Sequence, residues 1–348
     1  MAQTIPQDTG RSTRPANSPI KLALYWYTKL FAVWIVLFAM VGYFWYQPFV
    51  FLATHKMFGA AADSWPEIFQ PLRNPNLWFF ALTMFGIGAV LTVSDFKNIA
   101  KRPVIVLIGT LAQFTLMPLG AFALSKLFGL PPMLAAGLII AGCAPGAMSS
   151  NVMSYIAGAD TAYSVSLTTV STLLCPILTP ALTKLLTDQD LPVSFWSMFF
   201  QIIFMVVLPL GAGFLVRHFF SKTIEKIKDV FPAISVTFII FVCTLVIAVN
   251  RERMLQATLS IIAVVVLLNV YGMASGYGVG SFFKMPTQQR RTLAIEIGMQ
   301  NAGLGTVLAL NNLGPEAAIP TAFFVFVCII TASIMTEIWK SRGAFVGN

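Results

Sequence analysis

One carboxylate in this chain of 348 residues lies in the middle of an apolar segment. Glu296 opens the run Glu-Ile-Gly-Met-Gln-Asn-Ala-Gly, in which the amides Gln300 and Asn301 follow it closely. A carboxylate in hydrocarbon is unfavourable by several kcal/mol unless its charge is compensated. The histidines, His55 and His218, lie outside the apolar segments, and no Lys or Arg lies in the middle of one. We therefore expect a small cation or a proton at Glu296; a protonated glutamate that only packs between helices is the alternative.

A second apolar segment carries a similar interruption. It reads Gly142-Cys-Ala-Pro-Gly146-Ala-Met-Ser-Ser-Asn151. Pro145 lacks a backbone donor and clashes with the preceding turn, and Gly146 tolerates irregular dihedral angles. We expect the helix to break here. Non-helical backbone at membrane depth is tolerated only where protein covers it or where it lines a watery cavity.

Further oxygen-bearing side chains lie at the same expected depth. Ser164 and Thr168 are four residues apart and share a helix face, although such hydroxyls often bond only their own helix. Gln113 is less easily explained, because a primary amide needs several partners. Neutral oxygens around one carboxylate suit a monovalent hard cation, so sodium is the natural candidate and a proton on Glu296 is the rival.

The composition places these residues in a membrane protein. Hydrophobic residues make up 57% of the chain and charged residues 10%, against about a quarter charged in soluble domains. This excludes a soluble enzyme, and it excludes nucleic acid as a partner despite the net charge of +9. Apolar runs of roughly 20 residues predict ten spans. Their cores are 31–53, 77–93, 104–125, 131–155, 161–183, 194–216, 231–249, 255–282, 286–312 and 317–339.

Lysine and arginine positions predict the orientation. With ten spans both termini lie on one side, and 16 of the 22 Lys and Arg residues fall on that side. Positive residues collect on the cytoplasmic side, so both termini should be cytoplasmic in the cell (inner) membrane. Residues 1–28 are predicted to form a disordered cytoplasmic arm and residues 341–348 a cytoplasmic tail.

The two interruptions occupy corresponding positions. Dividing the chain into 29–187 and 188–340 gives five spans each, with a break in the fourth span of each half. An odd number of spans inverts the second half relative to the first. Inverted repeats whose broken helices cross at the midplane are typical of secondary transporters.

At these residues the sequence resembles the bile acid:sodium symporter (BASS) family, as a bacterial member. The motifs are Ala-Gln113-Phe-x-x-Met-Pro, Gly-Cys-x-Pro-Gly146, Ser-Val-Ser-Leu-Thr168-Thr-Val-Ser and Glu296-x-Gly-Met-Gln-Asn. The resemblance runs from about Phe79 to Trp339. It implies an all-α polytopic membrane protein of ten transmembrane helices in a five-plus-five inverted repeat, with panel and core domains and discontinuous crossing helices 4 and 9.

The resemblance also implies two sodium sites and transport by alternating access. One sodium ion would be held by Ser150, Asn151, Ser164, Thr168 and Glu296. The other would be held by Gln113, Glu296, Gln300 and the backbone carbonyls of Ile297 and Met299.

The expected substrate is a small organic anion. Met148 stands where many family members have a hydroxyl, and 326–331 is almost apolar where bile-acid-binding bacterial members offer a His-Asn pair. This favours a 2-keto acid or a pantoate-like acid over a bile-acid-like ligand. Asn301 and Ser149 are the candidates for substrate contact, with Met148, Cys328 and Thr331 as lining.

Other functions stay open at this point. A proton-coupled or uncoupled organic-acid carrier would titrate Glu296. An intramembrane enzyme would use Glu296 as a base, but no histidine or second carboxylate shares its depth. Arsenite-permease relatives use a cysteine at the first break, where Cys143 is the nearest thiol. The four cysteines lack metal-site spacing and predict neither a disulfide framework nor a metal cluster.

Overall fold

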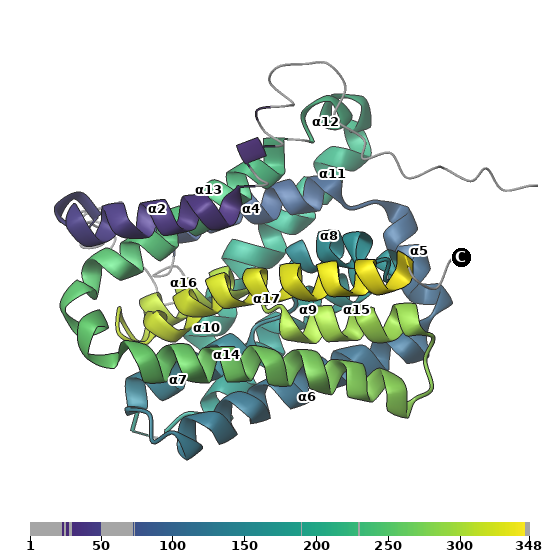
Figure 1. Ribbon diagram of the computed structural model, residues 1–348. Coiled ribbons are helices and arrows are strands. Elements are labelled where there is room, and N and C mark those ends of the chain that lie inside the picture. The colour runs from purple at the N-terminus through teal and green to yellow at the C-terminus, as the bar shows by residue number, and fades with distance from the viewer. Residues whose placement is uncertain are drawn as a thin grey trace, which may run out of the picture.

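The computed structural model describes residues 23, 26–27, 30–49, 72, 74–188, 190–228 and 230–344, and its regular secondary structure in these residues is helical (Figure 1). The predicted disordered arm lies outside the described residues except at positions 23 and 26–27. The predicted tail begins within the last helix, and residues 345–348 lie outside the described part.

The helices follow one another with short links. In chain order they are α2 (Phe31–Phe44), α4 (Pro75–Val90), α5 (Val93–Lys101), α6 (Pro103–Leu127), α7 (Pro132–Cys143), α8 (Ser149–Ile156), α9 (Thr161–Leu186), α10 (Phe195–Ile202), the π-helix η3 (Ile203–Val207), α11 (Leu208–Phe219), α12 (Ser221–Ile227), α13 (Val230–Val249), α14 (Arg251–Phe282), α15 (Thr287–Gly298), α16 (Ala302–Asn312) and α17 (Ala318–Ala344).

The chain is a helical, polytopic membrane protein. In the described residues, six helices are long and apolar enough to cross a bilayer, and the bent pair α4 and α5 could make a seventh. The other predicted spans fall short of a full crossing for identifiable reasons. The fourth and ninth are divided into α7 with α8 and α15 with α16, and α2 has only 14 residues, with 50–53 outside the described part. The count of ten, the inverted repeat and the division at 187 stay predictions.

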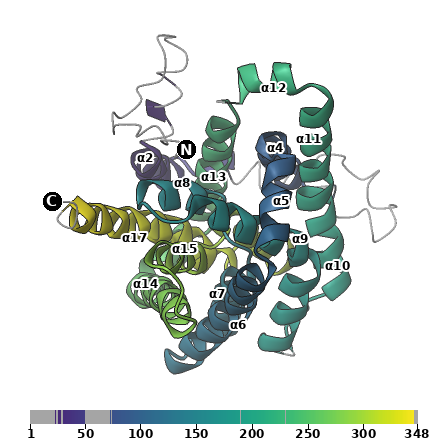
Figure 2. The same ribbon diagram turned by 90° about the vertical axis from the view of Figure 1, so that its right-hand side faces the viewer.

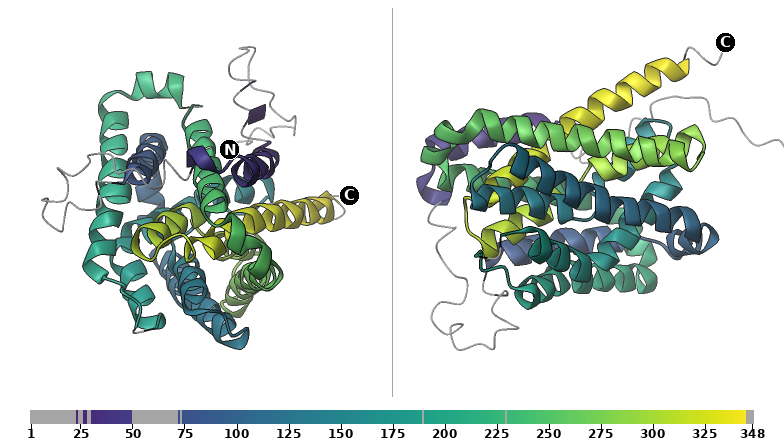
Figure 3. Two further views of the ribbon diagram at one scale, coloured as in Figure 1. Left: turned by 90° about the vertical axis from the view of Figure 1, so that its left-hand side faces the viewer. Right: turned by 90° about the horizontal axis from the view of Figure 1, so that it is seen from below.

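The helices pack in two groups. In one group α4 packs on α11 and α13, and α13 packs on α2; in the other, α14, α15, α6, α7, α9, α16 and α17 pack mainly on one another. Figure 2 shows α4 and α11 side by side, away from α6 and α14. Seen from below, α14 lies alongside α15 and α6 (Figure 3). Such a grouping is what panel and core domains require.

Two glycines hold α4 against α11 at backbone distance. A Cβ on Gly88 would collide with the carbonyl of Leu210, and a Cβ on Gly213 would collide with the carbonyl of Phe85. Small residues at these positions let the helix backbones approach, which is the usual source of helix association in membranes.

A short helix, α5, was not expected from the sequence. The second predicted span, 77–93, ends at Val90 instead, and α5 follows at 75° to α4. Its first turn carries a capping box, because the Thr92 amide donates to the Asp95 carboxylate at 2.8 Å. The Thr-x-x-Asp spacing was the available signal. Helix α12 was likewise not anticipated.

The glycine contact between α4 and α11 gives a stability prediction. Gly213→Ala should lower the free energy of unfolding by about 1–3 kcal/mol, because the added methyl group pushes α11 away from α4. Gly211→Ala is the matched control: it lies in the same helix with no atom within 4 Å of the added Cβ. It should be neutral or slightly stabilising. Thermal unfolding in detergent measures both, and equal midpoints would contradict the prediction.

Candidate cation site at two broken helices

The first break is set by Pro145. Ala144 ends α7 with extended backbone (ψ 154°), as expected for a residue that precedes proline. The chain stays irregular through Ala147, and α8 begins at Ser149. The predicted break in the fourth span is therefore confirmed.

The second break follows Gly298, the last residue of α15. Met299 is extended (φ −105°, ψ 95°), and α16 begins at Ala302. Asn301 caps α16, because its Oδ1 accepts from the Leu304 amide at 3.1 Å. Asn301 therefore has a structural role in addition to any contact with a ligand.

The two breaks meet. Gly146 and Gln300 form an antiparallel bridge, isolated from any strand. The Ala147 amide donates to the Met299 carbonyl at 2.9 Å, and the Asn301 amide donates to the Pro145 carbonyl at 2.7 Å. Each interrupted helix thus supplies hydrogen-bond partners for the backbone of the other, at a depth where water would not supply them.

Glu296 lies beside this junction and is 2% exposed. Its Oε2 accepts from Ser150 Oγ at 2.5 Å and from Ser164 Oγ at 2.9 Å. Its Oε1 accepts from Thr168 Oγ1. An ionised carboxylate only accepts hydrogen bonds, so donors from α8 and α9 suit its charged form. A Cβ at position 146 would collide with this carboxylate, which explains the glycine there.

Asn151 completes the oxygen cluster. Its Oδ1 lies 2.9 Å from Ser164 Oγ and 3.3 Å from Thr168 Oγ1, whose single protons can go either to this oxygen or to Glu296. The ion pairs in the described part of the chain join Arg102 to Asp160 and Glu225 to Arg217 and Lys228, and none involves Glu296. In the described residues, Glu296 is therefore surrounded by neutral oxygen groups and has no ion-pair partner.

A second cluster lies on the other side of the junction. Gln113 Nε2 donates to Gln300 Oε1 at 2.6 Å and to the Ala144 carbonyl at 3.3 Å. Gln300 Nε2 donates to the Ile297 carbonyl at 2.8 Å. Gln113 Oε1 is buried and has no hydrogen-bond partner. An orphaned carbonyl oxygen in a cluster of amide and backbone oxygens is a fitting donor set for a hard cation.

Asn269, in the middle of α14, belongs to this region but was missed in the sequence. It is 0% exposed, and its Nδ2 donates to the Gly298 carbonyl at 2.8 Å, while its Oδ1 has no partner. It therefore satisfies one of the carbonyls that the end of α15 leaves open. An amide in the middle of the eighth apolar run was the signal that could have found it.

The substrate candidates are more scattered. Met148 and Asn301 are half-buried beside the junction, and Ser149 is exposed. In α17, the Cys328 thiol and the Thr331 hydroxyl donate hydrogen bonds to carbonyls of their own helix, those of Val325 and Val327.

Cys143 is a buried free thiol. No group of three His, Cys, Asp or Glu residues gathers in the part of the chain that the structure describes. The sodium and substrate roles stay predictions.

The fold and the site define a class of membrane protein in which broken helices meet at a buried, oxygen-lined carboxylate. The sequence pattern of the Sodium Bile acid symporter family matches residues 77–257. The chain belongs to this family.

Relatives cover most of the chain. It is 36% identical over 314 residues to the "Uncharacterized sodium-dependent transporter YocS" of Bacillus subtilis (strain 168), covering 90% of this chain and 92% of that protein. It is 35% identical over 260 residues to the "Probable sodium/metabolite cotransporter BASS1, chloroplastic" of Arabidopsis thaliana, covering 74% of this chain and 65% of that one. The human "Sodium/bile acid cotransporter 4" is 29% identical over 244 residues, with 68% and 55% covered. The chain is therefore a transporter and not an enzyme.

Gly146 should be intolerant of any side chain. Gly146→Ala is expected to destabilise the protein by about 1–3 kcal/mol and to remove sodium-dependent stabilisation, because the methyl group displaces the Glu296 carboxylate. Gly303→Ala adds the same methyl group near the same junction, with its nearest neighbour at 3.6 Å, and should keep both properties. Unfolding midpoints in sodium and in potassium measure this. A sodium response of normal size in Gly146→Ala would contradict the expected displacement.

Asn269 should act on cation affinity through the Gly298 carbonyl. Asn269→Ala is expected to raise the sodium concentration for half-maximal thermal stabilisation about 10-fold, as for other residues that orient ligands. The control is Asn250→Ala, which removes a buried amide that donates to the Pro315 carbonyl at 2.9 Å, away from Glu296. It should lower stability without changing the sodium concentration required. Equal sodium responses of the two variants would refute this role for Asn269.

Proposed function

We propose that the protein is a sodium-coupled symporter of a small organic anion. The observation that carries this proposal is the buried Glu296, whose hydrogen-bond partners are the neutral hydroxyls of Ser150, Ser164 and Thr168. The sodium in the names of the family and of its relatives supports the same cation.

One sodium ion would be held by Glu296 and its neighbours. The ligands would be Ser150, Asn151, Ser164, Thr168 and Glu296. The three hydroxyls now donate their protons to the carboxylate, and each keeps lone pairs that can face a cation. The Asn151 oxygen is already oriented toward this position, because it lies within 3.3 Å of both Ser164 Oγ and Thr168 Oγ1.

A second sodium ion would lie on the Gln113 side of the junction. The orphaned Gln113 Oε1, the Glu296 carboxylate, Gln300 and the carbonyls of Ile297 and Met299 would hold it. Asn269 engages the intervening Gly298 carbonyl, and the Ile297 and Met299 carbonyls accept from Gln300 Nε2 and the Ala147 amide, so the ion would share or replace these bonds. Because Glu296 would serve both ions, loss of either should weaken the other.

Sodium would prepare the site for an anion. Two sodium ions and one carboxylate leave a net positive charge, and the N-termini of α8 and α16 add partial positive charge at the junction. An anion that binds beside them would raise the affinity for sodium, and sodium would raise the affinity for the anion equally. Asn301 and Ser149 would contact the anion, with Met148, Cys328 and Thr331 as lining.

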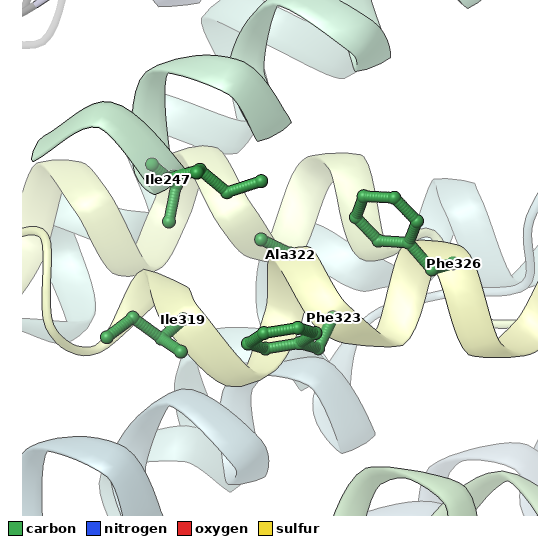
Figure 4. A pocket seen from close by; sticks show the side chains of 6 residues that line it. Ile247, Ile319, Ala322, Phe323 and Phe326 are labelled. Atoms are coloured by element: carbon green, nitrogen blue, oxygen red, sulfur yellow. The ribbon is translucent and has the colours of Figure 1, made fainter. Parts of the chain in front are cut away.

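A small acid is favoured over a bile acid by the sequence, because Met148 stands where a hydroxyl is usual and 326–331 is almost apolar. Figure 4 shows the apolar lining of a pocket between α13 and α17, which includes Ile247, Phe323 and Phe326. Its volume is about 10 Å³, room for no more than one water molecule. An organic acid would enter here only if the group containing α13 moved relative to that containing α17. Such a movement would constitute alternating access by panel and core domains. Each of the two proposed inverted repeats, 29–187 and 188–340, would contribute helices to both domains.

The orientation follows from charge. The protein would lie in the inner membrane with both termini in the cytoplasm, since 16 of the 22 lysines and arginines fall on the side of the termini.

A proton-coupled or uncoupled carrier is the second candidate function, because the same hydroxyls can form hydrogen bonds with a protonated Glu296.

A thermal-shift screen of small organic acids in sodium and in potassium tests the proposal. Sodium should raise the unfolding midpoint of the wild-type protein, and one 2-keto or pantoate-like acid should raise it further in sodium alone. A ligand at 100 times its dissociation constant stabilises by about 2.7 kcal/mol. Glu296→Gln should lose both increments, because the amide cannot balance sodium.

Glu337→Gln is the matched control, since Glu337 is exposed near the end of α17. It should respond as the wild-type protein does. Robust sodium stabilisation in Glu296→Gln would refute the assignment. Acid-dependent stabilisation that is equal in sodium and potassium and varies with pH would favour proton coupling.

A further inference from the structure

A cavity of about 150 Å³ lies at the end of the bundle, apart from the junction of the broken helices. Asn98, Lys101 and Arg102 line it from the end of α5 and the link to α6. Tyr163 and Ser166 line it from the first turns of α9. This volume accommodates a small polyatomic ion, whereas the pocket between α13 and α17 does not.

The lining of this cavity carries positive charge and no carboxylate. Arg102 donates through Nη1 to Asp160 at 2.6 Å, and its other guanidinium N–H groups are left for a further acceptor. Lys101 is exposed and forms no ion pair with any residue that the structure describes. Asp160 offsets one of the two cations, so the cavity keeps an excess of one positive charge. That excess suits an oxyanion.

The cavity lies at the first turns of α6 and α9, two helices long and apolar enough to cross a membrane, so it would lie at the level of the lipid headgroups. In Figure 1 most long helices run horizontally, and α5 turns downward across their right-hand ends. None of its residues is buried, and its 75° bend from α4 sets it across the bundle axis. Val93 at its start is 49% exposed, while Lys97 and Lys101 lie one turn apart along it. An exposed apolar residue next to basic ones is typical of a helix in the membrane interface.

We propose that this cavity binds a phosphate group. Arginine and lysine together match the geometry and charge of phosphate oxygens, and basic pockets between helices at the membrane surface bind lipid headgroups. Two sources share this chemistry, the headgroup of an anionic phospholipid and free phosphate from solution. The bound group would fasten α5 to the start of α9, whose Ser164 donates to Glu296. The proposal requires no particular transported substrate.

The test compares two lysines of one helix. Purified full-length protein in detergent is titrated with phosphatidylglycerol, phosphatidylcholine, inorganic phosphate or pyruvate, and the unfolding midpoint is followed. For a lipid source, phosphatidylglycerol should raise the midpoint and phosphatidylcholine should not. If the source is free phosphate, inorganic phosphate should raise the midpoint and phosphatidylglycerol should not. In both cases Lys101→Ala should weaken the apparent affinity at least 10-fold, while Lys97→Ala, with the same loss of charge outside the cavity, should change it less than twofold.

Asn98→Leu gives an independent readout, because it obstructs the cavity without changing its charge. It should weaken binding as Lys101→Ala does. Equal losses in Lys97→Ala and Lys101→Ala would overturn the proposal in favour of general surface attraction. The absence of any shift with either phosphate source would also overturn it. So would a larger shift with pyruvate, which would make the cavity part of the organic acid's route.

Discussion

The burial of one carboxylate among neutral oxygens is the constraint on which the rest of this structure depends. In the part of the chain that the structure describes, Glu296 pairs with no cationic side chain, and its hydrogen-bond donors are neutral hydroxyls. Hydroxyls on α8 and α9 provide the donors. Gly146 lacks the Cβ that would occupy the carboxylate's position. Under the proposed function, a cation from solution would balance the charge of this carboxylate.

The two helix breaks are stable only as a pair. Each break leaves backbone groups without helical partners at a depth where water would not satisfy them. The bonds from Ala147 to Met299 and from Asn301 to Pro145 join them across the junction, and Asn269 engages a further carbonyl. These hydrogen bonds therefore have two effects. They satisfy the backbone groups that the breaks leave unpaired, and they hold the irregular backbone that places oxygens at the site. Restoring either helix would remove partners from the other.

Packing between the two groups of helices differs from packing within each group. The glycine contacts of α4 with α11 bring backbones together within one group of helices, and α14 packs on α15 through Gly272 and Gly276 in the other. Between the groups, α13 and α17 meet at apolar side chains around a small void. Close backbone contact resists separation, whereas an apolar interface with imperfect packing permits sliding. This difference is what a carrier that moves one group against the other requires.

The sequence by itself determined most of the long helices, the break at Pro145 and the isolation of Glu296 from cationic side chains, because apolar length, proline chemistry and charge placement are local properties. It also indicated most of the cation-site candidates through their residue types. It did not reveal the short helices α5 and α12. Only the tertiary structure decided which oxygens converge: Ser150 and Glu296 are 146 positions apart in the chain. Gln113 Oε1 as an orphan, Asn269 on the Gly298 carbonyl and the basic cavity beside α5 arise from contacts between distant helices. A pattern along one chain specifies which face a helix buries, but it does not specify the neighbour that the face meets.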